Sequence, residues 1–187
     1  YYVNVRGWDT MIHTVNGFLA GAIGIALIDI LNRSERLQFK MSPAFVALTA
    51  FCFSMTVGVV WEFYEYGMDC IFRRDMQKDT VVDTISSIAL NPEGRNKAVV
   101  ITDIEESVIY GRINGQEVQI VINGYLDIGI HDTMKDLLVN FIGAIIMSII
   151  GYIHIKRRGK GPGSEFLKNL MPTIPASESI EPPDGSQ

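Results

Sequence analysis

Residues 43–61 read PAFVALTAFCFSMTVGVVW, a stretch that contains no charged side chain. Two further stretches have the same character: residues 10–31 read TMIHTVNGFLAGAIGIALIDIL, and residues 137–155 read LLVNFIGAIIMSIIGYIHI. A helix of about 20 apolar residues crosses the hydrocarbon core of a bilayer. We therefore predict a mainly α fold, a polytopic transmembrane helical bundle with three spans in this chain. The alternative is a set of buried core helices in a soluble protein.

The composition excludes several classes of protein. A disordered chain is excluded because 48% of the 187 residues are hydrophobic and 10% are aromatic. A nucleic-acid binder is not indicated, because the net charge is −5 and no basic stripe is present. Cys52 and Cys70 are too few for a disulfide scaffold. The chain starts at Tyr1 without a methionine, which we interpret as a processed or truncated product.

Cationic residues flank two ends of the predicted spans and give an orientation. They are Arg33, Arg36 and Lys40 between the first two spans, and Lys156, Arg157, Arg158 and Lys160 after the third. The positive-inside rule places both groups on the cytoplasmic side of a cell membrane. We expect residues 1–63 to hold the first two spans, 64–135 to be extracytoplasmic, 136–158 to be the third span and 159–187 to be a flexible cytoplasmic tail.

The extracytoplasmic segment is too long to be structureless. Residues 79–89 have apolar residues near helical spacing, which predicts a short helix. Strand-like runs follow from residue 98, and Asn114-Gly115 between two of them is typical of a type I′ hairpin turn. We predict a small β-hairpin or β-meander of two or three strands, whose main role is to position the segments on either side.

Acidic, imidazole and amide side chains repeat on one face of each span, at the end predicted to be extracytoplasmic. Helical spacing places i, i+4 and i+7 positions together. The DTVVD run at 79–83 repeats the DTMKD pattern at 132–136, and Asp75 and Gln77 lie nearby. The candidate site residues are Asp9, His13, Asn16, Glu62, Glu65, Asp69, Asp79, Asp83, His131, Asp132, Asp136 and Asn140.

Two interpretations of these residues stay open. Ionisable groups at a membrane edge are costly and tend to be functional, as metal ligands or as acid–base groups. For a divalent metal ion, the candidate ligands are Glu62, Glu65, His13 and Asp132. Alternatively, Asp9 and Asp132 are helix N-caps, or acids that complement the helix dipole. Glu62 and Glu65 escape that alternative, because they follow an apolar span at its C-terminal end.

The runs WDTMIH, WEFYEYGMD, DMQKDTVVD and HDTMKDLLVNFIGA, within residues 7–151, resemble the YjdF-like bacterial integral membrane proteins. They are more distantly similar to the VanZ-like group. The VanZ-like pattern falls on Asp9, His13, Glu62, Glu65, Asp136, Asn140, Gly143 and Ala144. The resemblance implies four to six spans, hence helices before Tyr1, and supplies no established reaction. The β insert departs from this pattern, in which the Asp-rich segment leads almost directly into the last span.

These observations support three hypotheses of function. The first is an integral membrane protein that acts on an envelope lipid or lipid-linked substrate through the polar site. The second is a non-enzymatic transporter component or membrane partner subunit. The third is an interaction protein whose β insert binds a partner. The lipid bilayer is the expected surrounding in each case, with no nucleic acid involved.

Overall fold

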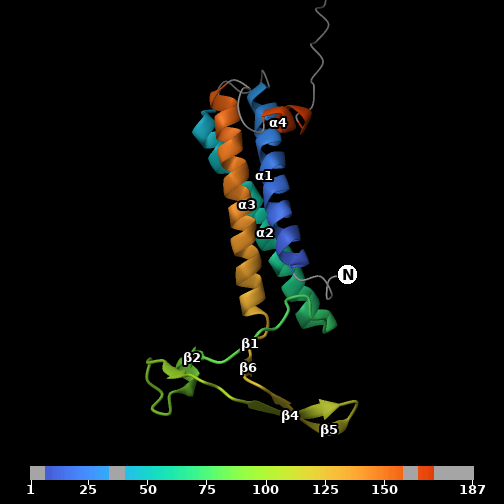
Figure 1. Ribbon diagram of the computed structural model, residues 1–187, viewed down its shortest axis with the longest axis vertical. Helices are drawn as coiled ribbons and strands as arrows, with labels where there is room; N and C mark the ends of the chain where they lie inside the picture. Colours follow the sequence, from blue (N-terminus) through green and yellow to red (C-terminus); the bar gives the residue numbers. More distant parts are fainter. Residues whose placement is uncertain (1–6, 34–40, 158–163, 171–187) are drawn as a thin grey trace, which may run out of the picture. The chain divides into compact units, whose positions relative to one another are not determined.

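The computed structural model describes residues 7–33, 41–157 and 164–170. Within these ranges the chain forms four α-helices, six strands and one 3₁₀ turn (Figure 1). The helices are α1 (Trp8–Arg33), α2 (Pro43–Phe72), α3 (Ile130–Lys156) and α4 (Ser164–Leu170). The strands are β1 (Val81–Val82), β2 (Ile85–Ser87), β3 (Val99–Ile101), β4 (Ser107–Ile113), β5 (Gln116–Ile122) and β6 (Tyr125–Leu126), with the 3₁₀ turn η1 (Ile88–Leu90) after β2.

Three of these helices, α1, α2 and α3, are long and apolar enough to cross a membrane. The predicted mainly helical class with three spans is therefore confirmed. Two helix ends lie beyond the predicted apolar stretches. The second helix continues past residue 61 to Phe72, and the third begins at Ile130. Neither extension contains a proline, so the helical hydrogen bonds continue into the polar sequence that carries the acids.

The chain divides into two compact units, and each contains part of every long helix. The first is Tyr1–Gly17 with Met55–Gly143, and the second is Phe18–Ser54 with Ala144–Gln187. The core of the second unit is formed by buried side chains from all four helices: Ala22, Ile25, Ile28, Val46, Ala50, Met147 and Leu167. Small residues allow this packing, since a Cβ on Gly24 would lie 3.0 Å from Ala50 Cα.

Helix α4 corrects part of the prediction for the C-terminal segment. Residues 164–170 were expected to belong to a flexible tail, in which residues 166–171 could form a short docking turn. They form a helix whose Leu167 side chain is fully buried. The Phe166 ring also lies 5.6 Å from the Phe18 ring. The apolar pair in SEFLKNL therefore anchors this segment. The rest of the predicted tail, 159–163 and 171–187, lies outside the described residues, as do Arg36, Lys40 and Arg158.

Within the first unit, Asn140 on α3 sits where two other helices present glycines. A Cβ on Gly17 of α1 would lie 2.8 Å from Asn140 Oδ1, and a Cβ on Gly58 of α2 would lie 2.5 Å from Asn140 Nδ2. The amide nitrogen also contacts Met55 Sδ at 3.6 Å. Because the two glycines lack side chains, α1 and α2 both approach α3 closely at this level.

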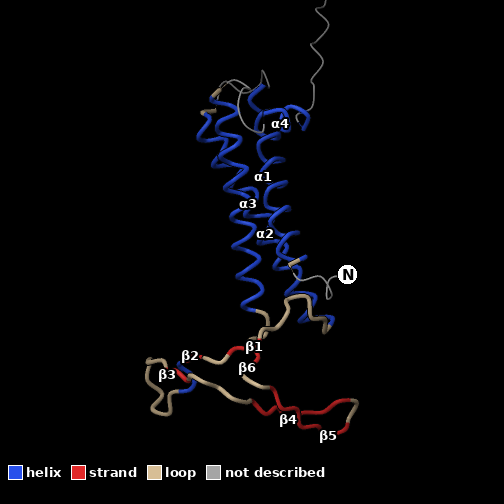
Figure 2. Tube along the Cα trace, viewed as in Figure 1, coloured by secondary structure: helices blue, strands red, loops and turns tan. Residues whose placement is uncertain are grey.

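The segment between α2 and α3 is built from three separate two-stranded antiparallel sheets (Figure 2). The predicted hairpin is confirmed: β4 pairs with β5 from Ser107↔Ile122 to Ile113↔Gln116. Both turn residues have positive φ, 52° at Asn114 and 84° at Gly115, as a type I′ turn requires.

Two other expectations for this segment are wrong. Residues 79–89 are not a helix, because β1 and β2 with the turn η1 occupy them. Their β-branched residues favour extended backbone. The strands also do not form one meander. Instead, β2 pairs with β3, and β1 pairs with β6 through Val81↔Leu126 and Val82↔Tyr125. The β1–β6 ladder closes the insert at its base.

Candidate metal centre

One buried group of side chains gathers residues from all three long helices of the first unit. We call it the carboxylate cluster: Asp9 and His13 of α1, Glu62 and Glu65 of α2, and Asp132 and Asp136 of α3. All except Asp9 are buried, and Asp136 is only 1% exposed. The buried positions follow helical spacing, so each helix turns the same side inward over successive turns.

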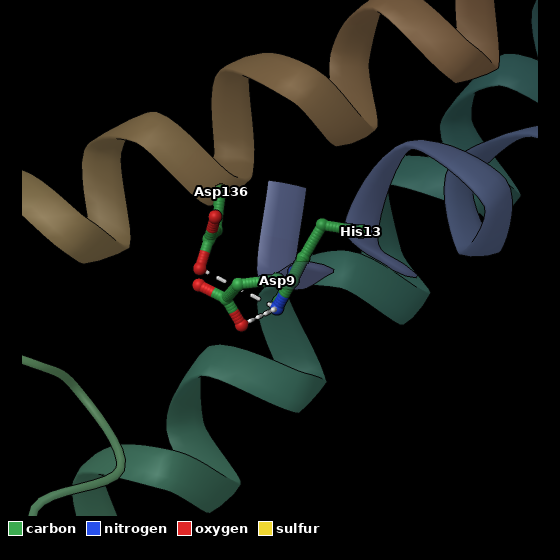
Figure 3. A group of neighbouring side chains, drawn as sticks. All are labelled: Asp9, His13 and Asp136. Atoms are coloured by element: carbon green, nitrogen blue, oxygen red, sulfur yellow. Dashed lines mark ion pairs between the residues drawn. The ribbon is translucent and has the colours of Figure 1, made fainter. Parts of the chain in front are cut away.

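His13 lies at the middle of this cluster. Its Nε2 is 3.4 Å from Asp136 Oδ2 and 3.8 Å from Asp9 Oδ1 (Figure 3). Its Nδ1 lies 3.8 Å from Glu62 Oε1. The two ring nitrogens therefore face two different sets of carboxylates, one from α1 and α3 and one from α2.

Two sets of potential ligand atoms have the spacing of a metal site. In Asp9, His13 and Asp136, and again in His13, Glu62 and Glu65, one ligand atom per residue lies within 4.8 Å of the others. Asp132, predicted as a fourth ligand, is in neither set. Its Oδ2 instead accepts a hydrogen bond from the Lys78 backbone N–H at 3.1 Å. The predicted ligand set is thus brought together in three of its four members.

Two lysines that the sequence reasoning missed reach the cluster. Lys78 Nζ lies 3.0 Å from Asp9 Oδ2 and 3.7 Å from Asp132 Oδ2. Lys135 Nζ lies 3.3 Å from Asp132 Oδ1 and 3.8 Å from both Asp9 and Asp136. Desolvation alone would lower the pKa of Lys78, but the neighbouring carboxylates outweigh it and raise that pKa. Lys135 could have been found from its i, i+3 spacing to Asp132, whereas Lys78 lies in a loop with no such signal.

The loop carrying Lys78 is fastened to the helices through its backbone. Asp69 accepts the N–H groups of Met76 and Gln77 at 2.7 and 2.8 Å. The Gln77 side chain donates to Thr133 Oγ1 at 2.6 Å. None of these bonds uses the Lys78 side chain. Asp69, a predicted site residue, therefore lies outside the cluster and holds the loop that delivers a lysine to it.

Asp127 was also not predicted, and it organises the start of α3. Its carboxylate accepts backbone N–H groups from Thr80 at 2.7 Å, His131 at 2.9 Å and Gly129 at 3.1 Å. Burial alone would raise the pKa of Asp127, but these bonds and the His131 ring outweigh it and hold that pKa well below its usual range. The chain around α3 is thus fixed by an ionised acid.

Several other predicted site residues do not join the cluster. Asn16 is exposed, because Gly17 continues the buried line of α1. His131 is exposed and contacts Asp127. Asp79 and Asp83 are exposed on the loop and the insert, and desolvation together with neighbouring acids raises the pKa of Asp79. Asn140 is buried one helical turn from Asp136, but its side chain lies against Met55 and the two glycines, Gly17 and Gly58.

The helix-cap interpretation of two acids is wrong. Asp9 and Asp132 lie inside the first turns of α1 and α3, after the helices have begun. Their charge does suit the positive end of each helix dipole. Asp132 uses its oxygens on Lys78 and Lys135, so its position serves the cluster and the loop.

Charge in the cluster is unevenly compensated among the described residues. The lysine ion pairs fall on Asp9, Asp132 and Asp136, whereas the described ion pairs put no lysine or arginine on Glu62 or Glu65. Glu65 Oε1 accepts a hydrogen bond from Trp61 Nε1 at 2.8 Å, but Glu62 Oε2 is buried without a hydrogen-bond partner. Buried anions require a counter-charge or a proton. The arrangement can therefore bind a cation or exchange protons.

A comparison with protein-family models matches residues 1–102 to DUF2238, described as a predicted membrane protein family. The matched part includes Asp9, His13, Glu62, Glu65 and Lys78 but ends before α3. No curated protein and no solved structure matches the chain.

Proposed function

Because the chain belongs to DUF2238, a family of predicted membrane proteins, we propose that it is a multi-pass membrane protein whose carboxylate cluster binds a divalent metal ion. The observation that carries the proposal is the pair of sets around His13, each of three potential ligands within 4.8 Å. All members except Asp9 are buried. In a membrane protein such residues are expensive to place and are typically functional.

A bound cation also supplies a counter-charge for Glu62 and Glu65, which have no lysine or arginine ion pair among the described residues. Glu62 is 5% exposed and its Oε2 has no hydrogen-bond partner. An isolated buried carboxylate costs several kilocalories per mole unless it is paired, protonated or bound to a metal. A divalent ion beside His13 supplies the charge that the two lysines, which lie on the other acids, leave uncompensated.

The donor set favours a transition metal over calcium or magnesium. Imidazole suits zinc, copper, iron and nickel, whereas all-oxygen sites suit magnesium, calcium and manganese. A site of one histidine and two carboxylates also leaves coordination positions open, as in catalytic zinc sites. We therefore expect Zn²⁺ or Fe²⁺ to bind more tightly than Mg²⁺.

The finer part of the proposal concerns location and substrate. The cluster residues lie in the first two turns of α1 and α3, and Glu62 and Glu65 lie in the last three turns of α2. Helix ends in a membrane protein lie near the headgroups. We propose that the cluster faces the extracytoplasmic side of a cell membrane, that the C-terminal tail is cytoplasmic, and that the substrate is lipid or lipid-linked. We also propose that the chain is related to the YjdF-like membrane proteins that its sequence runs resemble.

The test is metal binding by the whole chain purified in detergent. We expect about one Zn²⁺ per chain by elemental analysis and a saturable heat of binding by titration calorimetry. Glu62→Gln and His13→Ala should each lose most of the bound metal. The matched control is Glu117→Gln, because Glu117 is exposed on β5 and pairs only with Arg112 among the described residues. Absence of metal in the parent protein, with Zn²⁺ failing to bind on titration, refutes the proposal.

A second assay separates an enzyme from a transporter component. The protein is reconstituted in vesicles containing a zinc-sensitive dye. Zinc-dependent turnover of an added lipid phosphate or lipid-linked sugar, without dye response, supports the enzyme. Uptake of Zn²⁺ that Glu62→Gln abolishes supports the transporter and overturns the proposal of a lipid substrate.

A further inference from the structure

The two ring nitrogens of His13 cannot both serve as metal ligands in a neutral imidazole. One nitrogen carries the proton and the other carries the lone pair. The geometry places Glu62 by Nδ1, and Asp136 and Asp9 by Nε2. A metal ion on one side therefore requires a hydrogen-bond acceptor on the other side to fix the tautomer and the orientation of the ring.

The Nε2 side already contains positive charge. Lys78 Nζ lies 3.0 Å from Asp9 Oδ2, and Lys135 Nζ lies 3.8 Å from Asp136 Oδ1. The Lys78 ammonium is held there by a loop whose backbone is bonded to Asp69 and Asp132. A metal ion at Asp9 would have to displace this lysine or lie against it.

The Nδ1 side has the opposite character. Glu62 Oε2, Asp9 Oδ2 and Asp136 Oδ1 are all buried without a hydrogen-bond partner, but the two aspartate oxygens lie within 4 Å of a lysine Nζ. Among the described residues, Glu62 and Glu65 take no lysine or arginine ion pair. Their spacing with His13 meets the requirement for a shared ion. Both acids come from successive turns of α2, so one helix presents them together.

Resting on the proposed function, we infer that the ion binds on the Nδ1 side, to His13 Nδ1, Glu62 and Glu65, and that Asp136 is the orienting carboxylate. Asp136 Oδ2, 3.4 Å from His13 Nε2, accepts a hydrogen bond from the Nε2–H group and holds the imidazole with Nδ1 free to donate its lone pair. Asp136 is thus a positioning residue. Lys78 and Lys135 compensate the charge of Asp9 and Asp136 on the Nε2 side, so that Glu62 and Glu65 remain available to bind the metal ion.

The tautomer provides a test that does not depend on the strength of binding. The full chain is labelled with ¹⁵N-histidine, purified in detergent and titrated with Zn²⁺, and the His13 resonances are identified as those lost in His13→Gln. The inference expects a metal-bound Nδ1 and a protonated Nε2. A metal-bound Nε2 with a protonated Nδ1 overturns it and leaves the metal proposal standing. No change in the His13 signals at saturating Zn²⁺ overturns both.

Affinity measurements on three variants separate the two sides. Asp136→Asn should weaken Zn²⁺ binding roughly 10- to 100-fold, the usual effect of losing the carboxylate behind a ligating histidine. Asp9→Asn should weaken it by roughly fivefold at most, since it removes one partly exposed charge that is already paired with Lys78. Glu65→Gln should lose binding at the concentrations that saturate the parent.

Controls keep the comparison interpretable. Lys97→Met on the exposed β2–β3 connection should bind Zn²⁺ like the parent. Each variant is melted without metal, so that a folding defect is seen separately, and Asp136→Glu should restore part of the affinity lost in Asp136→Asn. A larger loss in Asp9→Asn than in Glu65→Gln places the ion on the Nε2 side and overturns the inference.

Discussion

Replacing Gly17 with alanine tests the helix packing that supports the cluster. A methyl group there would lie 2.8 Å from Asn140 Oδ1 and 3.0 Å from the Asn140 carbonyl carbon. The Asn140 carbonyl oxygen would lie closer still, and ordinary contact begins at 3.4 Å, so the α3 backbone has to move by about one ångström. Gly17 is one turn from His13, and Asn140 is one turn from Asp136. The same shift therefore separates the histidine from its nearest carboxylate.

The expected magnitude follows from two opposing effects. Overpacking of this kind costs about 1–3 kcal/mol. Alanine is favoured over glycine within a helix by roughly 0.5–1 kcal/mol. We expect Gly17→Ala to lower the free energy of unfolding by about 1–2 kcal/mol and to weaken Zn²⁺ binding roughly tenfold, a displacement effect comparable to losing a supporting contact.

The matched control is Gly67→Ala in α2, where an added Cβ has no neighbour within 4 Å. It should raise the free energy of unfolding by roughly 0.5–1 kcal/mol and leave Zn²⁺ affinity unchanged. Reversible unfolding in mixed detergent micelles, followed by circular dichroism, measures the first quantity, and calorimetry measures the second. The packing argument is refuted if Gly17→Ala is as stable as the parent and binds Zn²⁺ equally well.

Three further predictions concern the segments around the cluster. The hydrogen bonds to the Asp127 carboxylate lower its pKa below the unfolded value of 3.8, so the stability that they provide is present above pH 3.8 and is lost as the pH falls toward the folded pKa. Asp127→Asn should reduce this loss of stability in melting curves between pH 6 and pH 2, and should cost about 1.5–3 kcal/mol at pH 7. The carboxylate partners of Lys78 raise its pKa above 10.5, so its contribution to stability is present below pH 10.5 and is lost at higher pH. Lys78→Met should cost under about 1 kcal/mol of stability at pH 7, because the ammonium is partly exposed. Melting curves of the parent and the variant at pH 8 and above pH 11 measure this dependence. Gly115→Val puts a β-branched residue at a φ of 84° and should cost about 1–2 kcal/mol locally, seen as faster amide exchange across β4 and β5 with unchanged exchange in α3.

The spans and the grouping of acids could be predicted because both depend on local periodicity. Apolar stretches of about 20 residues identify membrane helices by length alone. Once helices are assumed, the spacing of Glu62 and Glu65, and of Asp132 and Asp136, places each pair on one side. That spacing does not show which residues of the other helices each side contacts. Asn16 was assigned to the inward side of α1, although Gly17, its neighbour in sequence, faces α3.

The loop and the insert could not be predicted in the same way, since they depend on contacts between distant residues. Lys78 reaches Asp9 only because Asp69 and Asp132 bind the loop backbone. The run at 79–89 was predicted as a helix from three apolar positions, but pairing with distant strands decided its structure. Strand pairing of this kind is set by partners far along the chain.

The β1–β6 ladder makes the insert an exchangeable cassette. Beside it, the Thr80 N–H donates to Asp127 Oδ1 at 2.7 Å and the Asp127 N–H donates to the Thr80 carbonyl oxygen at 3.0 Å. The two strands are therefore already side by side where they leave α2 and α3. Chains tolerate replacement where the two ends are close and the backbone between them is exposed. Residues 83–124 can accordingly be exchanged for a rigid folded domain that joins at Val82 and Tyr125. Such a graft would give this 20.8 kDa chain a fiducial mark for electron cryomicroscopy without altering the residues around His13.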